Sequence, residues 1–128
     1  MNILLDTHIA LWALSDDQKL SPTARSLILD DSNRIFTSVA SMWEVAIKKA
    51  LKPLLIPVSG VEFLHFCEHA GYESVPVRDR HVIALESLPP VHADPFDRIL
   101  ISQAKAEGML FMTHDTTLAG YGAEVLVV

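Results

Sequence analysis

Short apolar runs alternate along the chain with longer segments whose apolar residues recur every three or four positions. The short runs predict strands, and the longer segments predict helices. The strands are expected at residues 2–5, 34–37, 73–77, 109–113 and 123–128. The helices are expected near residues 9–14, 22–29, 39–51, 59–70, 78–88 and 95–107, with one further short turn of helix after residue 115.

Strands that alternate with helices are typical of a mostly parallel sheet covered by helices on both faces. The predicted fold is therefore an α/β fold, a three-layer α/β/α sandwich. A chain of 128 residues suits one domain around one core, so we expect residues 1–128 to form a single domain.

Local signals support several of these boundaries. Ser21 followed by Pro22, and Ser38 alone, are typical of helix starts, and Gly71 is typical of a helix end. Pro76 should place the third strand at the edge of the sheet or at the strand's end. In the helix that follows Ser38, the predicted apolar face consists of Trp43, Ala46, Ile47 and Ala50.

Composition narrows the class of protein. Half of the residues are hydrophobic, and a single cysteine, Cys67, leaves no internal disulfide to form. No apolar stretch approaches the roughly 20 residues of a membrane span, and the N-terminus lacks a basic leader, so we expect a cytoplasmic protein with no membrane partner. The net charge of −6 argues against binding nucleic acid by positive charge alone.

Acidic residues stand where two predicted strands end. Asp6 follows the first apolar run directly, and Asp115 follows the run at residues 109–113. If these strands are parallel neighbours, both carboxylates point into the crevice at the carboxyl edge of the sheet, where ligands bind in such folds. The alternative is that each acid only caps the helix that follows it.

Three further acids have comparable alternatives. Asp94 and Asp97 flank Pro95 at a predicted helix start, where the first is a natural N-cap and the second suits the helix dipole or a metal ion. Glu44 lies four residues before Lys48 on a predicted helix, which by itself favours a solvated ion pair.

A cluster of carboxylates suits a hard cation with oxygen ligands, such as Mg²⁺ or Mn²⁺. Without metal, repulsion within the cluster should raise at least one carboxyl pKa. The chemistry that this arrangement favours is hydrolysis of a phosphate ester by a metal-activated water.

Other sites are less well supported by the sequence. His65 and His69 have a spacing that can bind zinc, but no HExxH pattern accompanies them, so a surface role is favoured. A nucleophilic Asp6 would be followed two residues later by a second Asp in aspartyl phosphatases, and His8 stands there instead. Cys67 has no activating partner and is expected in the core.

Four segments together resemble the PIN-domain ribonucleases, and more narrowly the VapC-type toxins of bacterial toxin–antitoxin pairs. They are Leu4–His8, Ser41–Lys48, His92–Ala104 and Thr113–Asp115. The resemblance implies a catalytic site built from Asp6, Glu44, Asp97 and Asp115, with Mg²⁺ or Mn²⁺ held by Asp6, Asp97 and Asp115. It also implies supporting roles for Thr7, Asp94 and Thr113, and RNA cleavage that leaves a 5′-phosphate and a 3′-hydroxyl.

The resemblance further implies partners. Such toxins are usually homodimers that a cognate antitoxin protein holds inactive, and their substrate is RNA. Lys48, Lys49 and Lys52 follow Glu44 and are candidate contacts to RNA phosphates, or else a solvated helix end. The alternatives are a catalytically inactive PIN-like module that binds RNA or protein, and a metal-dependent phosphatase or DNase.

Overall fold

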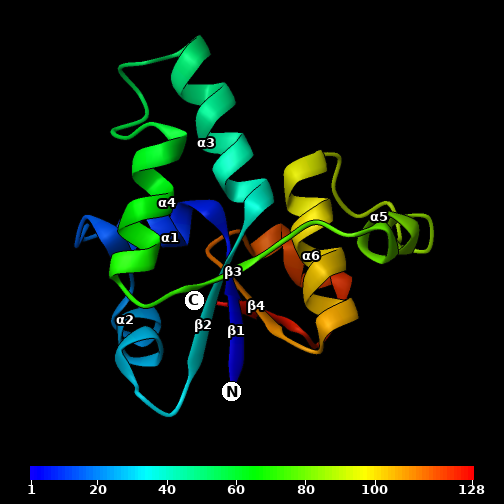
Figure 1. The fold of residues 1–128 in the computed structure, drawn as a ribbon. Coiled ribbons are helices and arrows are strands. Elements are labelled where there is room, and N and C mark those ends of the chain that lie inside the picture. Colours follow the sequence, from blue (N-terminus) through cyan, green and yellow to red (C-terminus); the bar gives the residue numbers. More distant parts are fainter.

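The computed structural model describes residues 1–128, which form five strands and seven helical segments (Figure 1). None of the helices combines the length and apolar character needed to cross a membrane. The strands are β1 (Asn2–Leu5), β2 (Arg34–Ser38), β3 (Glu73–Val75), β4 (Leu110–Thr113) and β5 (Val125–Val127). The helices are α1 (Thr7–Leu14), α2 (Pro22–Leu29), α3 (Val39–Leu51), α4 (Gly60–His69), α5 (Asp79–Leu85), α6 (Pro95–Glu107) and the 3₁₀ helix η1 (Thr116–Tyr121).

The five strands form one sheet in the order β3-β2-β1-β4-β5, and every neighbouring pair is parallel. The predicted α/β class with a parallel sheet is therefore confirmed. The chain builds outward from β1 through β2 to β3, then crosses to the other side of β1 and adds β4 and β5. The strand order thus reverses beside β1, which is where ligands bind in open parallel sheets.

Alternate residues of the strands face two separate cores. In β1, Ile3 and Leu5 pack into one core with residues of α1, α2 and α4, while Leu4 packs into the other with residues of α6 and η1. Figure 1 shows α1, α2 and α4 on one side of the sheet and α5 and α6 on the other. This is the three-layer arrangement that the alternation of elements predicts.

Most boundaries follow the capping residues. Ser21 and Ser38 accept backbone hydrogen bonds as N-caps, and Gly108 ends α6 in the left-handed conformation with φ 68°. β3 lies at the sheet edge and ends at Val75, because Pro76 has no N–H to continue the ladder. The helix expected to reach residue 88 ends at Leu85, and turns lead from there to the two prolines.

The predicted apolar face of α3 is wrong. Trp43 is 61% exposed, and Ala46 and Ala50 are exposed as well. The buried face carries Ala40, Ser41, Glu44 and Val45 instead. Periodicity misleads here because α3 continues beyond the carboxyl edge of the sheet (Figure 1). There, Glu44 and Lys48 of α3 line a polar cleft and not an apolar core.

Candidate metal centre

Asp6 and Asp115 lie at the carboxyl ends of the adjacent strands β1 and β4. Asp6 is buried and makes no side-chain cap to α1, so capping does not explain it. Its Oδ2 accepts a hydrogen bond from Thr113 Oγ1 at 2.6 Å. Asp115 does cap η1, through Oδ1 and the Thr117 N–H at 3.0 Å, while its Oδ2 faces His92. The cap and the open oxygen thus coexist on one carboxylate.

Glu44 reaches the same region from α3 and is only 4% exposed. One of its oxygens accepts a hydrogen bond from Thr7 Oγ1 at 2.7 Å, and the other pairs with Lys48. Ser41 Oγ lies 2.8 Å from the same threonine hydroxyl. The expected pair with Lys48 is present, but it is not a solvated surface pair, because burial and Thr7 fix the carboxylate toward the cleft.

Asp94 and Asp97 hold the start of α6. Asp94 is the N-cap, and its Oδ1 accepts hydrogen bonds from the N–H groups of Phe96 at 2.8 Å and Asp97 at 3.4 Å. Pro95 occupies the first helical position, as the sequence predicts. The cap fixes the first turn of α6, and Asp97 projects from that turn into the cleft.

These acids line one open cleft of about 330 Å³. Its walls are Asp6, His8, Trp12, Glu44, Lys48, His92, Asp94, Asp97, His114 and Asp115. Sequence reasoning did not assign His8, Trp12, His92 or His114 to the site. Each lies within six residues of a predicted site acid, and this proximity in sequence could have suggested that they line the same site. Single histidines and a tryptophan, however, form no sequence motif that would identify a site by themselves.

The charge in the cleft shifts several pKa values. Burial, together with the negative charges of Asp6, Asp94, Glu44 and Asp115, raises the pKa of Asp97 to about 7. Burial also raises the pKa of Asp6, against the opposing effect of the Thr113 hydrogen bond. The hydrogen bond from Thr117 lowers the pKa of Asp115. Although partial burial alone would lower it, the pKa of the Lys48 amine is raised because Glu44 accepts its hydrogen bond.

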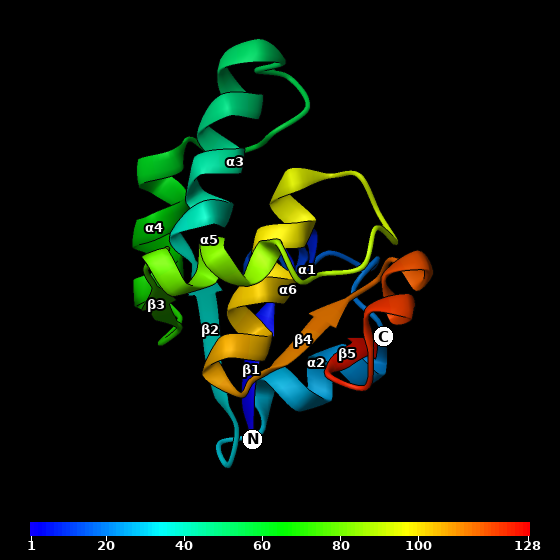
Figure 2. The ribbon, with the colours of Figure 1, turned by 90° about the vertical axis from the view of Figure 1, so that its right-hand side faces the viewer.

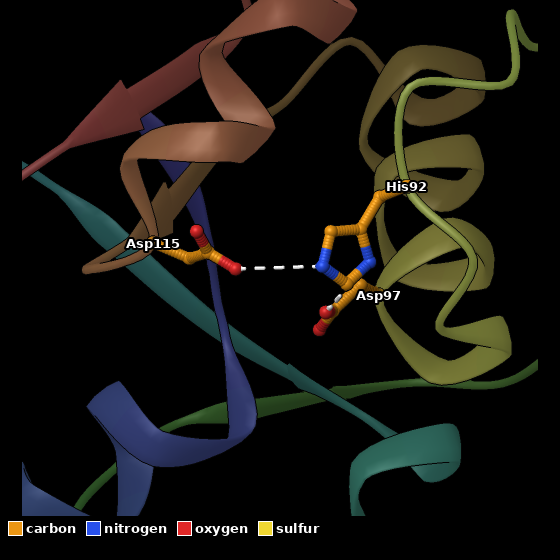
Figure 3. A group of neighbouring side chains, drawn as sticks. All are labelled: His92, Asp97 and Asp115. Carbon is orange, nitrogen blue, oxygen red and sulfur yellow. Dashed lines mark ion pairs between the residues drawn. The ribbon is translucent and has the colours of Figure 1, made fainter.

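The donor set fits a hard divalent cation. Carboxylate oxygens dominate the cleft, and ligand atoms of His92, Asp97 and Asp115 lie within 4.8 Å of one another (Figure 3). Lys48 is the only lysine or arginine that lines the cleft, and it is already paired with Glu44. A bound cation would therefore relieve the repulsion that raises the pKa of Asp97.

The three lysines occupy different surroundings. Lys48 lines the cleft, whereas Lys52 is exposed beside a second hollow that Leu51 and Leu55 also line. Lys49 Nζ donates hydrogen bonds to the carbonyl oxygens of Pro53 at 3.0 Å and Ile56 at 2.9 Å, so it holds the loop after α3.

The remaining candidates lie outside the cleft. His65 and His69 are exposed on α4, as expected for a surface role. Cys67 is buried among the residues of one core, which confirms its expected place.

The model of the PIN domain family matches residues 3–124, so the chain belongs to the PIN-domain family. Proteins of this family are generally nucleases and typically depend on a divalent metal. Membership therefore supports, at this coarse level, a nuclease.

Two solved structures share the fold at low sequence identity. VapBC2 from Rickettsia felis, bound to a DNA fragment from their promoter, matches with a TM-score of 0.70 and 13% identity over 100% of this chain and 98% of that chain. FitAcB from Neisseria gonorrhoeae matches with a TM-score of 0.58 and 21% identity over 98% of this chain and 95% of that chain. No curated protein sequence gives a significant match.

Proposed function

We propose that this protein is a metal-dependent endoribonuclease and the toxin of a type II toxin–antitoxin pair. The observation that carries the nuclease assignment is the convergence of Asp6, Glu44, Asp97 and Asp115 on one cleft at the carboxyl edge of the sheet. Four carboxylates gathered without a matching number of basic groups suit a site that binds a divalent cation and a phosphodiester.

In this proposal Asp6, Asp97 and Asp115 hold Mg²⁺, or Mn²⁺ in its place. When bound, the ion supplies an activated water and offsets negative charge on the phosphoryl oxygens. Thr113 orients Asp6, and the Asp94 cap orients Asp97. Thr7 and Lys48 fix the two oxygens of Glu44, which leaves this carboxylate able to orient a water at the edge of the cleft.

The substrate and partners rest on the family resemblance. RNA is the proposed substrate, with Lys48 and Lys52 as contacts to its phosphates, and Lys49 contributes only if it leaves the loop carbonyls. An antitoxin partner and a homodimer are supported by exposed apolar side chains on α3, α4 and the loop between them. These include Trp43 (61% exposed), Leu51 (75%), Leu54 (99%), Leu55 (70%) and Val61 (55%). The cytoplasm is the proposed location.

The test is cleavage of total bacterial RNA by purified protein freed of any antitoxin, with Mg²⁺ or Mn²⁺ and with excess chelator. Asp97→Asn removes one proposed ligand while preserving the shape of the side chain. We expect discrete, metal-dependent products from the unchanged protein and at least a 100-fold loss of rate in the variant. The size of this loss follows the roughly 3 kcal/mol that one essential electrostatic contact contributes to a transition state.

Asp31→Asn is the matched control, because Asp31 is an exposed acid outside the cleft, and it should cleave at the unchanged rate. Cleavage that persists in chelator or in Asp97→Asn would contradict the assignment. Cleavage of DNA alone would favour a DNase, and a folded protein that binds RNA without cleaving it would favour a binding module.

A further inference from the structure

His92 is the histidine that stands between two of the proposed metal ligands. Its Nδ1 lies 3.7 Å from Asp97 Oδ2, and its Nε2 lies 3.7 Å from Asp115 Oδ2. Figure 3 shows the ring projecting from the segment before α6 into the space between the two carboxylates. Both distances exceed hydrogen-bond length, so neither carboxylate is bonded to the ring.

The backbone selects one tautomer of this ring. The N–H of Asp94 donates a hydrogen bond to His92 Nδ1 at 3.1 Å. Because Nδ1 accepts, the proton of the neutral imidazole must sit on Nε2. His92 therefore presents an N–H group to the cleft, and this donor has no hydrogen-bond partner within the protein.

A second set of contacts fixes the backbone of His92. The N–H of His92 donates to Tyr121 Oη at 2.8 Å, and Tyr121 Oη donates to the carbonyl oxygen of His92 at 3.2 Å. Arg98 donates to the same hydroxyl at 3.0 Å and to the carbonyl of Pro89 at 3.0 Å. Tyr121 is 3% exposed, so a buried residue of η1 anchors the backbone of His92, while the Asp94 N–H holds its ring. The imidazole is thus held in place before any ligand arrives.

A phosphodiester entering this cleft meets mostly negative groups and needs donors that are not already engaged. Lys48 uses one of its three N–H groups on Glu44 and carries the other two at the end of a long, flexible side chain that is 42% exposed, and His114 uses Nδ1 on the carbonyl of Val128 at 2.9 Å. His8 is exposed and has no anchoring hydrogen bond. His92 Nε2 is the donor in the cleft that is both free and fixed in direction.

We propose that His92 is a substrate-contacting residue whose Nε2–H donates a hydrogen bond to a non-bridging oxygen of the phosphodiester bound in the cleft. This inference rests on the proposed nuclease function. The positive end of this N–H dipole attracts the phosphate at a place where the carboxylates of Asp97 and Asp115 would otherwise repel it. This donor role also distinguishes His92 from the metal ligands, because coordination through Nε2 would require the other tautomer, in which Nδ1 carries the proton and can no longer accept the hydrogen bond of the Asp94 N–H.

Two amide variants separate these roles. His92→Asn keeps an acceptor near the position of Nδ1 for the Asp94 N–H but removes the donor at Nε2. His92→Gln carries an amide donor at about the reach of Nε2. His65→Ala, on the exposed face of α4, is the control for removal of a histidine outside the cleft. For each protein, kcat and KM on single-stranded RNA are measured together with the Kd for Mn²⁺ by electron paramagnetic resonance.

We expect kcat/KM to fall about 10- to 100-fold in His92→Asn, the range for losing one hydrogen bond to a charged group. His92→Gln should recover most of this loss, and His65→Ala should match the unchanged protein. The Kd for Mn²⁺ should stay within about twofold in all of them, since the donor, not a metal ligand, has been changed.

A loss of Mn²⁺ affinity of tenfold or more in His92→Asn would overturn the inference and make His92 a metal ligand. An unchanged kcat/KM in His92→Asn, beside normal cleavage by the unchanged protein, would overturn it while leaving the nuclease function intact. No RNA cleavage by the folded, unchanged protein would overturn both.

Discussion

A single hydroxyl group joins the two strand-end acids. Thr113 Oγ1 donates its proton to Asp6 Oδ2 at 2.6 Å and accepts the backbone N–H of Asp115 at 3.1 Å. Thr113 is fully buried, so this link is not weakened by water. Asp97 has no comparable donor, and burial together with four other acids raises the pKa of its carboxyl to about 7.

The raised pKa of Asp97 makes the stability of the metal-free protein depend on pH. The carboxyl titrates near 7 in the folded protein and near about 4 when unfolded. Between these values the folded state binds more protons than the unfolded state, so the free energy of unfolding falls as pH rises through this window. Asp97→Asn should therefore add about 1–2 kcal/mol to the free energy of unfolding at pH 8 and less than half as much at pH 5, where the carboxyl of the folded protein is still protonated. Both values are discounted because solvent screens the partly exposed carboxyl.

Urea unfolding in chelator at both pH values measures this difference. Asp31→Asn should show the same small change at pH 5 and pH 8, since Asp31 is exposed and outside the cleft. A loss of stability at pH 8 in Asp97→Asn would show that the carboxylate is held by favourable contacts and not by unrelieved repulsion.

At the scale of elements, the start of α6 does the most to build the site. Asp94 caps the helix with its carboxylate and orients His92 with its N–H, and Asp97 follows within the same turn. Arg98, one residue later, anchors the preceding loop through Tyr121 and Pro89. One turn of helix therefore positions three groups of the cleft.

Capping and ligation by Asp94 predict different outcomes for two substitutions. Asparagine caps a helix as well as aspartate does. The free energy of unfolding of Asp94→Asn should therefore lie within a few tenths of a kcal/mol of that of the unchanged protein. Asp94→Ala should lose about 1 kcal/mol and should cleave RNA more slowly, because the first turn no longer holds Asp97. Urea unfolding and initial cleavage rates measure both effects.

If Asp94 were itself a metal ligand, the result would differ. Asp94→Asn would then lose as much cleavage as Asp94→Ala despite its normal stability. The comparison therefore distinguishes the supporting role that the cap favours from a direct role in metal binding.

The elements were largely predictable from the sequence, and the functions of individual acids were not. Alternation of apolar runs and helical periods gave the strand and helix order, and Pro76 marked the edge strand. Glu44 shows the limit: its spacing from Lys48 predicts a surface pair, whereas its burial depends on how α3 lies against Thr7. The position of the His92 backbone depends on a hydrogen bond to Tyr121, which lies 29 residues away in sequence. A contact between residues so far apart cannot be predicted from a local sequence pattern.

For the molecule as a whole, the strand order places the cleft. Asp6 follows β1, and Asp115 follows the adjacent strand β4. The sheet extends from β1 to one side through β2 and β3, and to the other side through β4 and β5. α3 and α6 add Glu44 and Asp97 to the cleft. Figure 2 shows α3 extending beyond the end of β2 and α6 running back beside the sheet. Because these four elements (β1, β4, α3 and α6) contribute carboxylates to one cleft, the carboxylates are brought together only in the folded chain, and their repulsion is a property of the whole fold.

The most direct test of the nuclease assignment is the chemistry of the ends that cleavage leaves. A short RNA is first cut by the purified protein with Mg²⁺ or Mn²⁺ to locate the scissile bond, and a second RNA then carries a 2′-deoxynucleotide immediately 5′ to that bond. Attack by a water should cleave both RNAs at similar rates and leave a 5′-phosphate and a 3′-hydroxyl. A 2′,3′-cyclic phosphate, or failure to cut the substituted RNA, would show attack by the 2′-hydroxyl and contradict hydrolysis in the carboxylate cleft.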